Sequence, residues 1–176
     1  LVPLVEQLTT FHVNSFAEIY YYLVAYFLMN IGVFAVLAAV SASSGTEEMS
    51  GFAGLYYRAP WTAFAMVLLV LSLAGLPVTG GFFGKLFILL GTIHNQVYWL
   101  AVVMILTSIA SFYYYFAIVK QMFMRSTEMS QSVKLTIPQA VTIWFCAIAG
   151  VAMGFYPQGL LEPINDIFLY MGDFFF

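Results

Sequence analysis

The fold is decided by the stretch Leu71-Ser72-Leu73-Ala74-Gly75-Leu76-Pro77-Val78-Thr79-Gly80-Gly81-Phe82-Phe83-Gly84-Lys85. It lies within an apolar segment from Trp61 to Gly91, which as one helix would be about 45 Å long, well over the roughly 30 Å hydrocarbon core of a bilayer. Pro77 removes a backbone donor and clashes with the preceding turn, and the neighbouring glycines tolerate non-helical dihedral angles. The stretch therefore predicts two half-helices joined by a break at residues 75–81, which contains Gly75, Pro77, Gly80 and Gly81.

The composition of the whole chain is that of a membrane protein. Of 176 residues, 63% are hydrophobic and only 7% are charged, against roughly a quarter charged in an average soluble domain. A net charge of −3 excludes a nucleic-acid footprint and a basic membrane-surface patch. The single cysteine, Cys146, lies in an apolar run, which excludes a disulfide framework and clustered metal ligands. We therefore expect no metal site, and without a glycine-rich phosphate loop after a strand we expect no cofactor site in this chain.

Four apolar segments are long enough to cross a bilayer as helices. They run from about residue 17 to 42, 61 to 91, 97 to 122 and 137 to 156. The chain opens at Leu1 with a short apolar stretch that has no basic region and no cleavage site, so it resembles the tail of a helix and not a signal peptide. We expect an all-α membrane protein: one membrane domain over residues 1–176, with four transmembrane helices, the second broken, a partial helix before them, and a longer protein upstream.

The basic residues indicate the orientation, because cytoplasmic loops near span ends are enriched in lysine and arginine. Arg58 follows the first span, and Lys120, Arg125 and Lys134 flank the segment after the third. Residues 9–16, 92–96 and 157–176 contain no lysine or arginine. Alternate loops are therefore expected in the cytoplasm, which places the C-terminus on the other side of the membrane. Glu6 and Glu18 flank the first loop and are expected to be interfacial.

Lys85 is the only ionisable residue in the interior of any expected span. Burial disfavours its charged form, and so does the positive end of the second half-helix about one turn away. An amine in this position can take up and release a proton, and intramembrane ionisable residues usually mark ion pathways. The alternative is that the long side chain snorkels toward the membrane surface. No intramembrane carboxylate is available as a hard ligand for Na⁺, which favours protons.

Further polar side chains are candidates for a proton path, each with a simpler structural explanation. Thr107, Ser111 and Tyr115 form a stripe at four-residue spacing on the third span, which could relay protons or could form interhelical hydrogen bonds. Asn30 lies in the middle of the first span, where an amide must find partners and packing is the simpler role. His94 follows the second half-helix, where it could accept a proton from Lys85 or be plain polar surface.

The stretch from Leu71 to Lys85 resembles the broken twelfth helix of the antiporter-like membrane subunits of respiratory complex I, the proton-pumping NADH:quinone oxidoreductases. Within that family it is most similar to the N-type subunit, called subunit 2 in mitochondria. The similarity extends over nearly the whole chain and includes the segments Gly54-Leu55-Tyr56-Tyr57-Arg58-Ala59-Pro60, Ser108-Ile109-Ala110-Ser111-Phe112-Tyr113-Tyr114-Tyr115 and Gly154-Phe155-Tyr156-Pro157.

This resemblance implies the C-terminal portion of a proton-translocating subunit, in which Lys85 matches the broken-helix lysine near the proton exit. The family's other charged participants, one glutamate and two lysines, would lie upstream of Leu1. The chain would act as an enzyme only as part of the translocase, with no redox site of its own. NADH, FMN, iron–sulfur clusters and quinone would bind elsewhere in the complex. The partners would be its other membrane subunits and the lipid bilayer, in a bacterial plasma membrane in preference to a mitochondrial or thylakoid one.

Two alternatives stay open. A subunit of a multisubunit Na⁺/H⁺ antiporter shares the broken helix and its lysine, although the triple tyrosine at 113–115 and the Tyr156-Pro157 ending favour complex I. Genes for the other NADH dehydrogenase subunits beside this one would support complex I, and antiporter genes would support the alternative. The second alternative is a structural scaffold in which Lys85 is incidental.

Overall fold

The computed structural model describes residues 15–124 and 133–175, with side-chain surroundings up to residue 167. Every regular element in these ranges is a helix, which confirms the all-α prediction. In order they are α2 (Ser15–Ser44), the 3-10 helix η1 (Met49–Phe52), α3 (Leu55–Arg58), α4 (Pro60–Ala74), α5 (Gly80–His94), α6 (Tyr98–Met124), α7 (Ile137–Phe155) and α8 (Gln158–Phe175). The expected partial helix at the N-terminus and Arg125 lie outside the described residues.

In the part of the chain that the structure describes, three helices are long and apolar enough to cross a membrane: α2, α6 and α7. Their ends lie within two residues of the expected spans at 17–42, 97–122 and 137–156. The expected span at 61–91 contains two shorter apolar helices, α4 and α5, of 15 residues each, or about 22 Å. Residues 75–79 between them are not helical. Gly80 and Gly81, expected in the break, belong instead to the first turn of α5, where no helical N–H bond is yet required.

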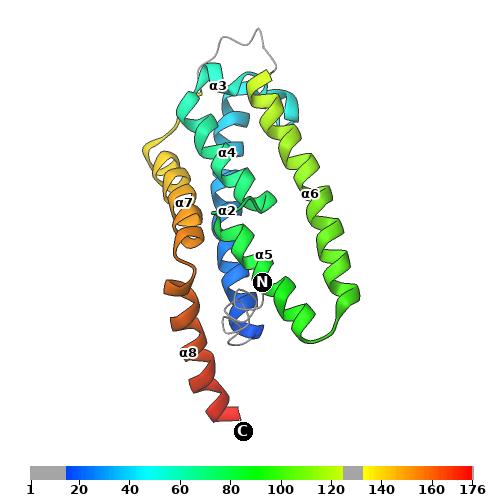
Figure 1. Ribbon diagram of the computed structural model, residues 1–176. Coiled ribbons are helices and arrows are strands. Elements are labelled where there is room, and N and C mark those ends of the chain that lie inside the picture. Colours follow the sequence, from blue (N-terminus) through cyan, green and yellow to red (C-terminus); the bar gives the residue numbers. More distant parts are fainter. Residues whose placement is uncertain (1–14, 125–132, 176) are drawn as a thin grey trace.

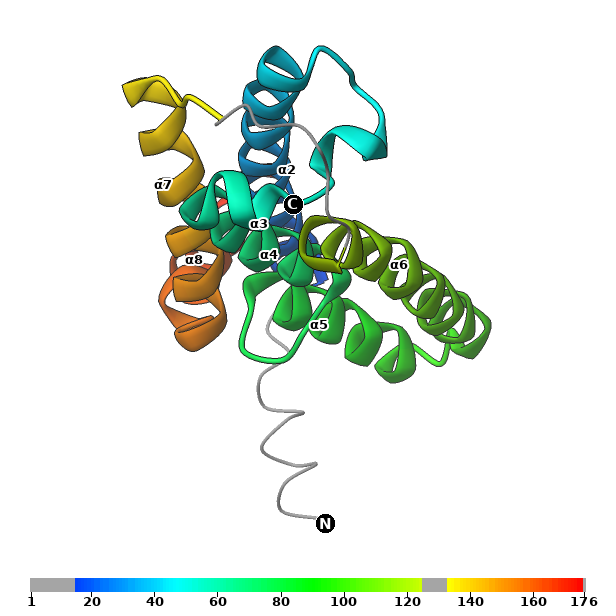
Figure 2. The same ribbon diagram turned by 90° about the horizontal axis from the view of Figure 1, so that it is seen from above.

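Helix α2 occupies the centre of the molecule and packs against α4, α5, α7 and α8. Figures 1 and 2 show α6 and α7 on opposite sides of this centre, with α4 and α5 following each other down the molecule. Helix α6 contacts α4 and α5 along one side, and its other side is exposed. The junction of α4 and α5 therefore lies between α2, α6 and α7.

Three buried clusters hold the described part of the bundle together. One surrounds Val40, Leu55 and Met66 near α3, and another surrounds Tyr21 and Met153 near the α4–α5 junction. The third consists of Leu69 on α4 and Cys146 and Ala147 on α7. Tyr21 is fully buried, and its hydroxyl donates a hydrogen bond of 2.7 Å to the carbonyl of Met153. This bond ties α2 to α7 beside the junction, because a buried phenol requires a polar partner.

The segment after Pro157 forms α8, which was not expected because this segment contains no long apolar run. Leu161 and Ile164 are buried, whereas Glu162 and Asp166 on the same helix are exposed. Apolar residues at such three-residue spacing stabilise a helix by packing one face, without the continuous apolar run of a membrane span.

Candidate functional site at a helix break

Helix α4 ends in a Schellman motif at Gly75. The backbone of Gly75 is left-handed, with φ 90°, its N–H donates to the carbonyl of Ser72, and the N–H of Leu76 donates to the carbonyl of Leu71. These two bonds are the ones that define the motif, and glycine is favoured because a left-handed backbone is costly for other residues. The motif leaves the next two carbonyls, of Leu73 and Ala74, without a helical N–H donor.

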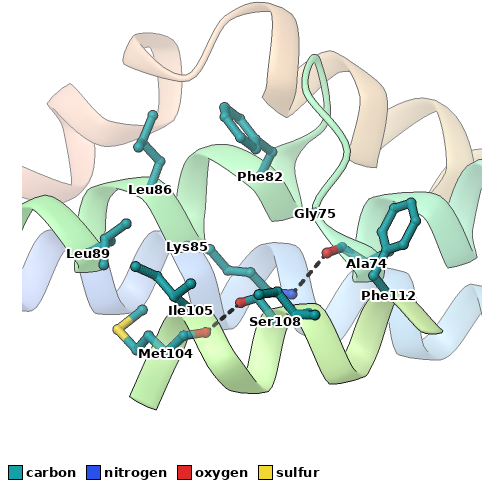
Figure 3. Close-up of a pocket in the computed structure, with 11 residues that line it drawn as sticks. Ala74, Gly75, Phe82, Lys85, Leu86, Leu89, Met104, Ile105, Ser108 and Phe112 are labelled. Atoms are coloured by element: carbon teal, nitrogen blue, oxygen red, sulfur yellow. Dashed lines mark hydrogen bonds between the residues drawn. The ribbon is translucent and has the colours of Figure 1, made fainter. Parts of the chain in front are cut away.

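Lys85 supplies the donor for both of these carbonyls. Its Nζ atom lies 2.9 Å from the carbonyl oxygen of Leu73 and 3.3 Å from that of Ala74. Figure 3 shows the side chain reaching from α5 back to the end of α4. The amine is therefore held at the junction, and the side chain does not extend toward the far end of α5 as a snorkelling lysine would.

The electrostatic surroundings of Lys85 differ from those expected from the sequence. We expected the positive end of α5 to act on the amine, but the amine lies on the negative end of α4, where carbonyl dipoles stabilise a cation. A side chain five residues into α5 can turn back to the preceding helix, which one-dimensional spacing does not show. Two opposing effects remain: the carbonyls favour the ammonium ion, and the apolar surroundings disfavour it.

A cavity of about 330 Å³ lies beside the amine, between α5 and α6. Its walls are almost entirely apolar, and its only side chains with polar atoms are those of Lys85 and Ser108. The Ser108 hydroxyl donates a hydrogen bond of 2.7 Å to the carbonyl of Met104. Its oxygen lone pairs can therefore still accept a hydrogen bond from a donor in the cavity. The lining residues are Ala74, Gly75, Phe82, Lys85, Leu86, Leu89, Met104, Ile105, Ser108, Ile109 and Phe112.

Glycines let neighbouring helices approach this junction closely. A Cβ atom on Gly154 of α7 would collide with the backbone of Val78 and Thr79, and one on Gly81 would collide with the carbonyl of Ser72. A Cβ atom on Gly84 would lie 3.1 Å from the Cα of Tyr22 on α2. Backbone atoms cannot move aside as flexible side chains can, so Gly81 and Gly154 require glycine, whereas a methyl group on Gly84 would need α2 to shift by a few tenths of an ångström.

The junction also holds a residue in an unfavourable conformation. Val78 has φ 81°, which is rare for a β-branched side chain and is maintained only where surrounding structure enforces it. The next residue, Thr79, donates its hydroxyl to the carbonyl of Leu76 at 2.7 Å. The close contact of Val78 and Thr79 with Gly154 supplies the enforcement.

Replacing Gly75 with alanine is expected to lower stability by about 1–2 kcal/mol, the cost of a left-handed backbone for an L-residue. The new methyl group would lie 3.6 Å from Nζ of Lys85, an ordinary contact distance, so the strain comes from the backbone alone. The midpoint of thermal unfolding of the assembled protein measures this loss. Gly75→Asn is the control, because asparagine tolerates this conformation better, and an equal loss for both variants would contradict the explanation.

The structure does not bring the other candidate path residues into contact with Lys85. Thr107 donates to the carbonyls of Val103 and Met104, and Ser111 donates to that of Thr107. Asn30 donates to the carbonyl of Tyr26 at 2.7 Å. Each of these groups is thus bonded to its own helix, the common arrangement for hydroxyls in apolar helices. Tyr115 is partly buried beside Tyr114, with ring centroids 4.4 Å apart.

His94 lies at the far end of α5 and is exposed. It follows Lys85 by nine residues, or about 13 Å along the helix, so direct proton transfer between them is excluded by distance. Glu18, expected to be interfacial, lies in the first turn of α2 and is 3% exposed. A Cβ atom on Gly91 would lie 2.9 Å from its carboxylate, so the missing side chain of Gly91 makes room for Glu18.

Sequence reasoning missed the carbonyls of Leu73 and Ala74 and the hydroxyl of Ser108. The first could have been found from the glycine at position 75, because a Schellman motif leaves specified carbonyls unpaired. Ser108 adjoins the stripe at 107, 111 and 115, and the one-residue offset turns it by about 100° toward α5. Within the described ranges, no group of three His, Cys, Asp or Glu side chains is placed to bind a metal ion.

Comparison with known proteins shows which family this chain matches. Residues 6–111 match the family described as NADH:quinone oxidoreductase/Mrp antiporter, transmembrane. NADH-quinone oxidoreductase subunit N of Paenibacillus sp. (strain JDR-2) is 48% identical over 99% of this chain and 34% of its own length. The protein of the same name from Brevibacillus brevis is 44% identical over 94% of this chain and 32% of its own length. The chain thus spans about a third of the length of each of these relatives.

A chain of respiratory complex I from Thermus thermophilus with bound aureothin has a similar structure. The TM-score is 0.72 at 28% sequence identity, and the match covers 83% of this chain and 34% of that one.

Proposed function

Since this chain belongs to the NADH:quinone oxidoreductase/Mrp antiporter transmembrane family, we propose that it forms part of a proton-translocating subunit N of an NADH:quinone oxidoreductase. The identity of 48% to a subunit N over nearly the whole chain supports this assignment. The complex would couple quinone reduction to proton movement, and this chain would carry one end of the proton path, with Lys85 as the proton-carrying residue.

The topology that fits this role has four membrane crossings. Helices α2, α6 and α7 each cross alone, and α4 and α5 cross together as one interrupted helix, since each is shorter than the hydrocarbon core. Non-helical backbone is tolerated at membrane depth where protein or a polar cavity satisfies it, and Lys85 does so for Leu73 and Ala74. In this arrangement the cytoplasmic side holds Arg58 just before α4, Lys120 in the last turns of α6 and Lys134 just before α7, which puts α8 on the opposite side.

One observation carries the proposal: the amine of Lys85 bonds two main-chain carbonyls at the break and faces a cavity. An ammonium ion has three N–H donors, and the carbonyls occupy two of them. The third can pass its proton into the cavity toward Ser108, while the neutral amine keeps its two carbonyl partners. Proton loss therefore does not require the side chain to leave its place, which makes Lys85 suited to repeated loading and release.

The rest of the proposed proton path consists of polar side chains farther from Lys85. We keep Thr107, Ser111, Tyr115 and Asn30 as candidates, together with His94 at the surface. Because the hydroxyl and amide groups of Thr107, Ser111 and Asn30 are bonded to their own helices, they would act by binding water and not by direct contact with Lys85.

Ser108→Ala is expected to slow proton translocation several-fold while leaving assembly intact. The hydroxyl is the polar side chain that shares the cavity with Lys85, whereas the helix loses only one bond, to Met104. NADH-driven acidification of inverted membrane vesicles measures the rate. Thr142→Ala is the matched control, because its hydroxyl makes the same kind of bond, to the carbonyl of Pro138, and does not line the cavity, and equal slowing by both variants would remove Ser108 from the path.

The environment proposed for this protein follows from the same family membership. Its partners would be the other membrane subunits of the complex and the lipid bilayer, and NADH, FMN, iron–sulfur clusters and quinone would be bound by other subunits. The bacterial relatives favour the plasma membrane as the location.

A subunit of a multisubunit Na⁺/H⁺ antiporter is the second candidate, because the family description includes such antiporters. Purification of the full-length protein through an affinity tag separates the two. We expect it to co-purify with NADH-oxidising activity and to support NADH-driven proton uptake that does not depend on Na⁺. Co-purification without NADH oxidation, with Na⁺-dependent proton exchange in vesicles, would establish the antiporter instead.

A further inference from the structure

Helices α4 and α7 each carry a carbonyl in the last turn that a proline leaves without its helical donor. Leu73 precedes Pro77 by four residues, and Met153 precedes Pro157 by four residues. The carbonyl of a helical residue accepts from the N–H four residues later, and proline has no N–H. The carbonyls of Leu73 and Met153 therefore both need a donor from outside their own helix.

A side chain from another helix supplies the donor at each end. Lys85 on α5 donates to the carbonyl of Leu73 at 2.9 Å. The hydroxyl of Tyr21 on α2 donates to the carbonyl of Met153 at 2.7 Å. The buried cluster around Tyr21 contains both Leu73 and Met153. It also contains Phe87 on α5, whose ring meets that of Tyr21 edge-on with centroids 5.6 Å apart. Tyr21 therefore lies in one packed group with the two helix ends and the helix that carries Lys85.

The end of α7 that accepts this bond is packed directly against the break. A Cβ atom on Gly80, the first residue of α5, would lie 2.9 Å from the Cβ atom of Met153. Gly154, the next residue of α7, is equally close to the backbone that precedes α5. The position of α7 thus limits where α5 can begin. Lys85 follows Gly80 by only five residues, or about 7.5 Å along the helix, so a shift of this start would move Lys85 as well.

We propose that Tyr21 is a positioning residue for Lys85, a role that rests on the proposed function of Lys85 as the proton-carrying residue. The hydroxyl of Tyr21 ties α2 to the end of α7, and α7 holds the break and the first turn of α5 in place. This arrangement keeps the amine of Lys85 within reach of the carbonyls at the end of α4. Tyr21 acts through this packing, because its side chain is fully buried and its hydroxyl proton is bonded to a main-chain carbonyl.

The first test is a structure of the intact membrane complex with Tyr21→Phe, which removes the hydroxyl and keeps the ring against Phe87. We expect the end of α7 to move away from the start of α5. Nζ of Lys85 should then lie more than about 3.5 Å from the carbonyl oxygen of Leu73, beyond hydrogen-bond distance. If both bonds of Lys85 were unchanged, the proposal would be overturned. This distance is measured whether or not Lys85 carries protons, so a failure here is distinct from a failure of the proposed function.

The second test is the rate of NADH-driven proton translocation per amount of assembled complex. We expect Tyr21→Phe to lower this rate roughly tenfold, because misplacing a reacting group by about 1 Å can cost up to about 100-fold. Tyr26→Phe is the matched control, since it makes the same chemical change farther along α2, where the side chain is 45% exposed. A natural rate for Tyr21→Phe, or equal slowing by both variants, would also overturn the proposal.

A Pro157→Ala background separates the tie between the helices from the simple pairing of a buried carbonyl. Alanine restores an N–H four residues after Met153, so this carbonyl gains a donor from its own helix. Only the tie between α2 and α7 then still depends on Tyr21. Relative to Pro157→Ala alone, the added Tyr21→Phe change should slow translocation as much as it does in the natural protein. If the added change had no effect in this background, carbonyl pairing would explain the role of Tyr21 and positioning would be excluded. The comparison also holds should Tyr21→Phe alone fail to assemble, because the carbonyl is paired in both variants.

Discussion

Replacing Lys85 with methionine in the full-length subunit is expected to lower NADH-driven proton translocation about 100-fold, the lower end of what a positioned acid–base group contributes. Methionine matches the apolar stem of lysine and fits the walls of the cavity, but it has no proton to carry. The measurement is the rate of vesicle acidification per amount of assembled complex, so that any loss of assembly is counted separately.

The methionine variant also removes two hydrogen bonds from the end of α4, and a bond to a charged group contributes about 1.5–3 kcal/mol. Lys85→Arg separates this structural effect from proton transfer. A guanidinium ion can donate to the carbonyls of Leu73 and Ala74, but it does not release its proton in a protein. We expect the arginine variant to assemble normally and still fail to translocate protons. Normal translocation by an assembled complex with either variant would contradict a proton-carrying role for Lys85.

The sequence allowed the location of the site to be predicted because the signals were local. Proline and glycine act on their own backbone, so the junction near Gly75 and Pro77 was visible without tertiary information. A lone lysine in an apolar segment is costly wherever the segment packs, so Lys85 stood out for the same reason. The ends of α2, α6 and α7 were close to expectation because bilayer thickness limits the length of an apolar run.

The partners of the site were not predictable from spacing. The bonds from Lys85 to Leu73 and Ala74 depend on how α5 turns back on α4, and that angle is set by packing against α2 and α7. The same packing decides that Ser108 and not Thr107 lines the cavity. Helix α8 escaped notice because its stabilisation comes from one buried face and not from a long apolar run.

The second large effect is a loss of stability, expected at Gly154, where α7 packs against the break. Gly154→Ala is expected to destabilise the assembled protein by about 3 kcal/mol, the upper end of the usual cost of overpacking. The new methyl group would overlap backbone atoms of Val78 and Thr79, so relief requires α7 or the whole break to move. The yield of assembled complex and the thermal midpoint of its activity should both fall.

Gly150→Ala is the matched control, since it places the same methyl group one helical turn earlier on α7. Its contacts at 3.8 Å are ordinary, and alanine has a higher helix propensity than glycine, so stability should stay within about 1 kcal/mol. A general requirement for small residues between membrane helices would make both variants equally harmful. A difference between them instead assigns the requirement to the backbone of Val78 and Thr79, which α7 holds in the conformation that keeps the end of α4 within reach of Lys85.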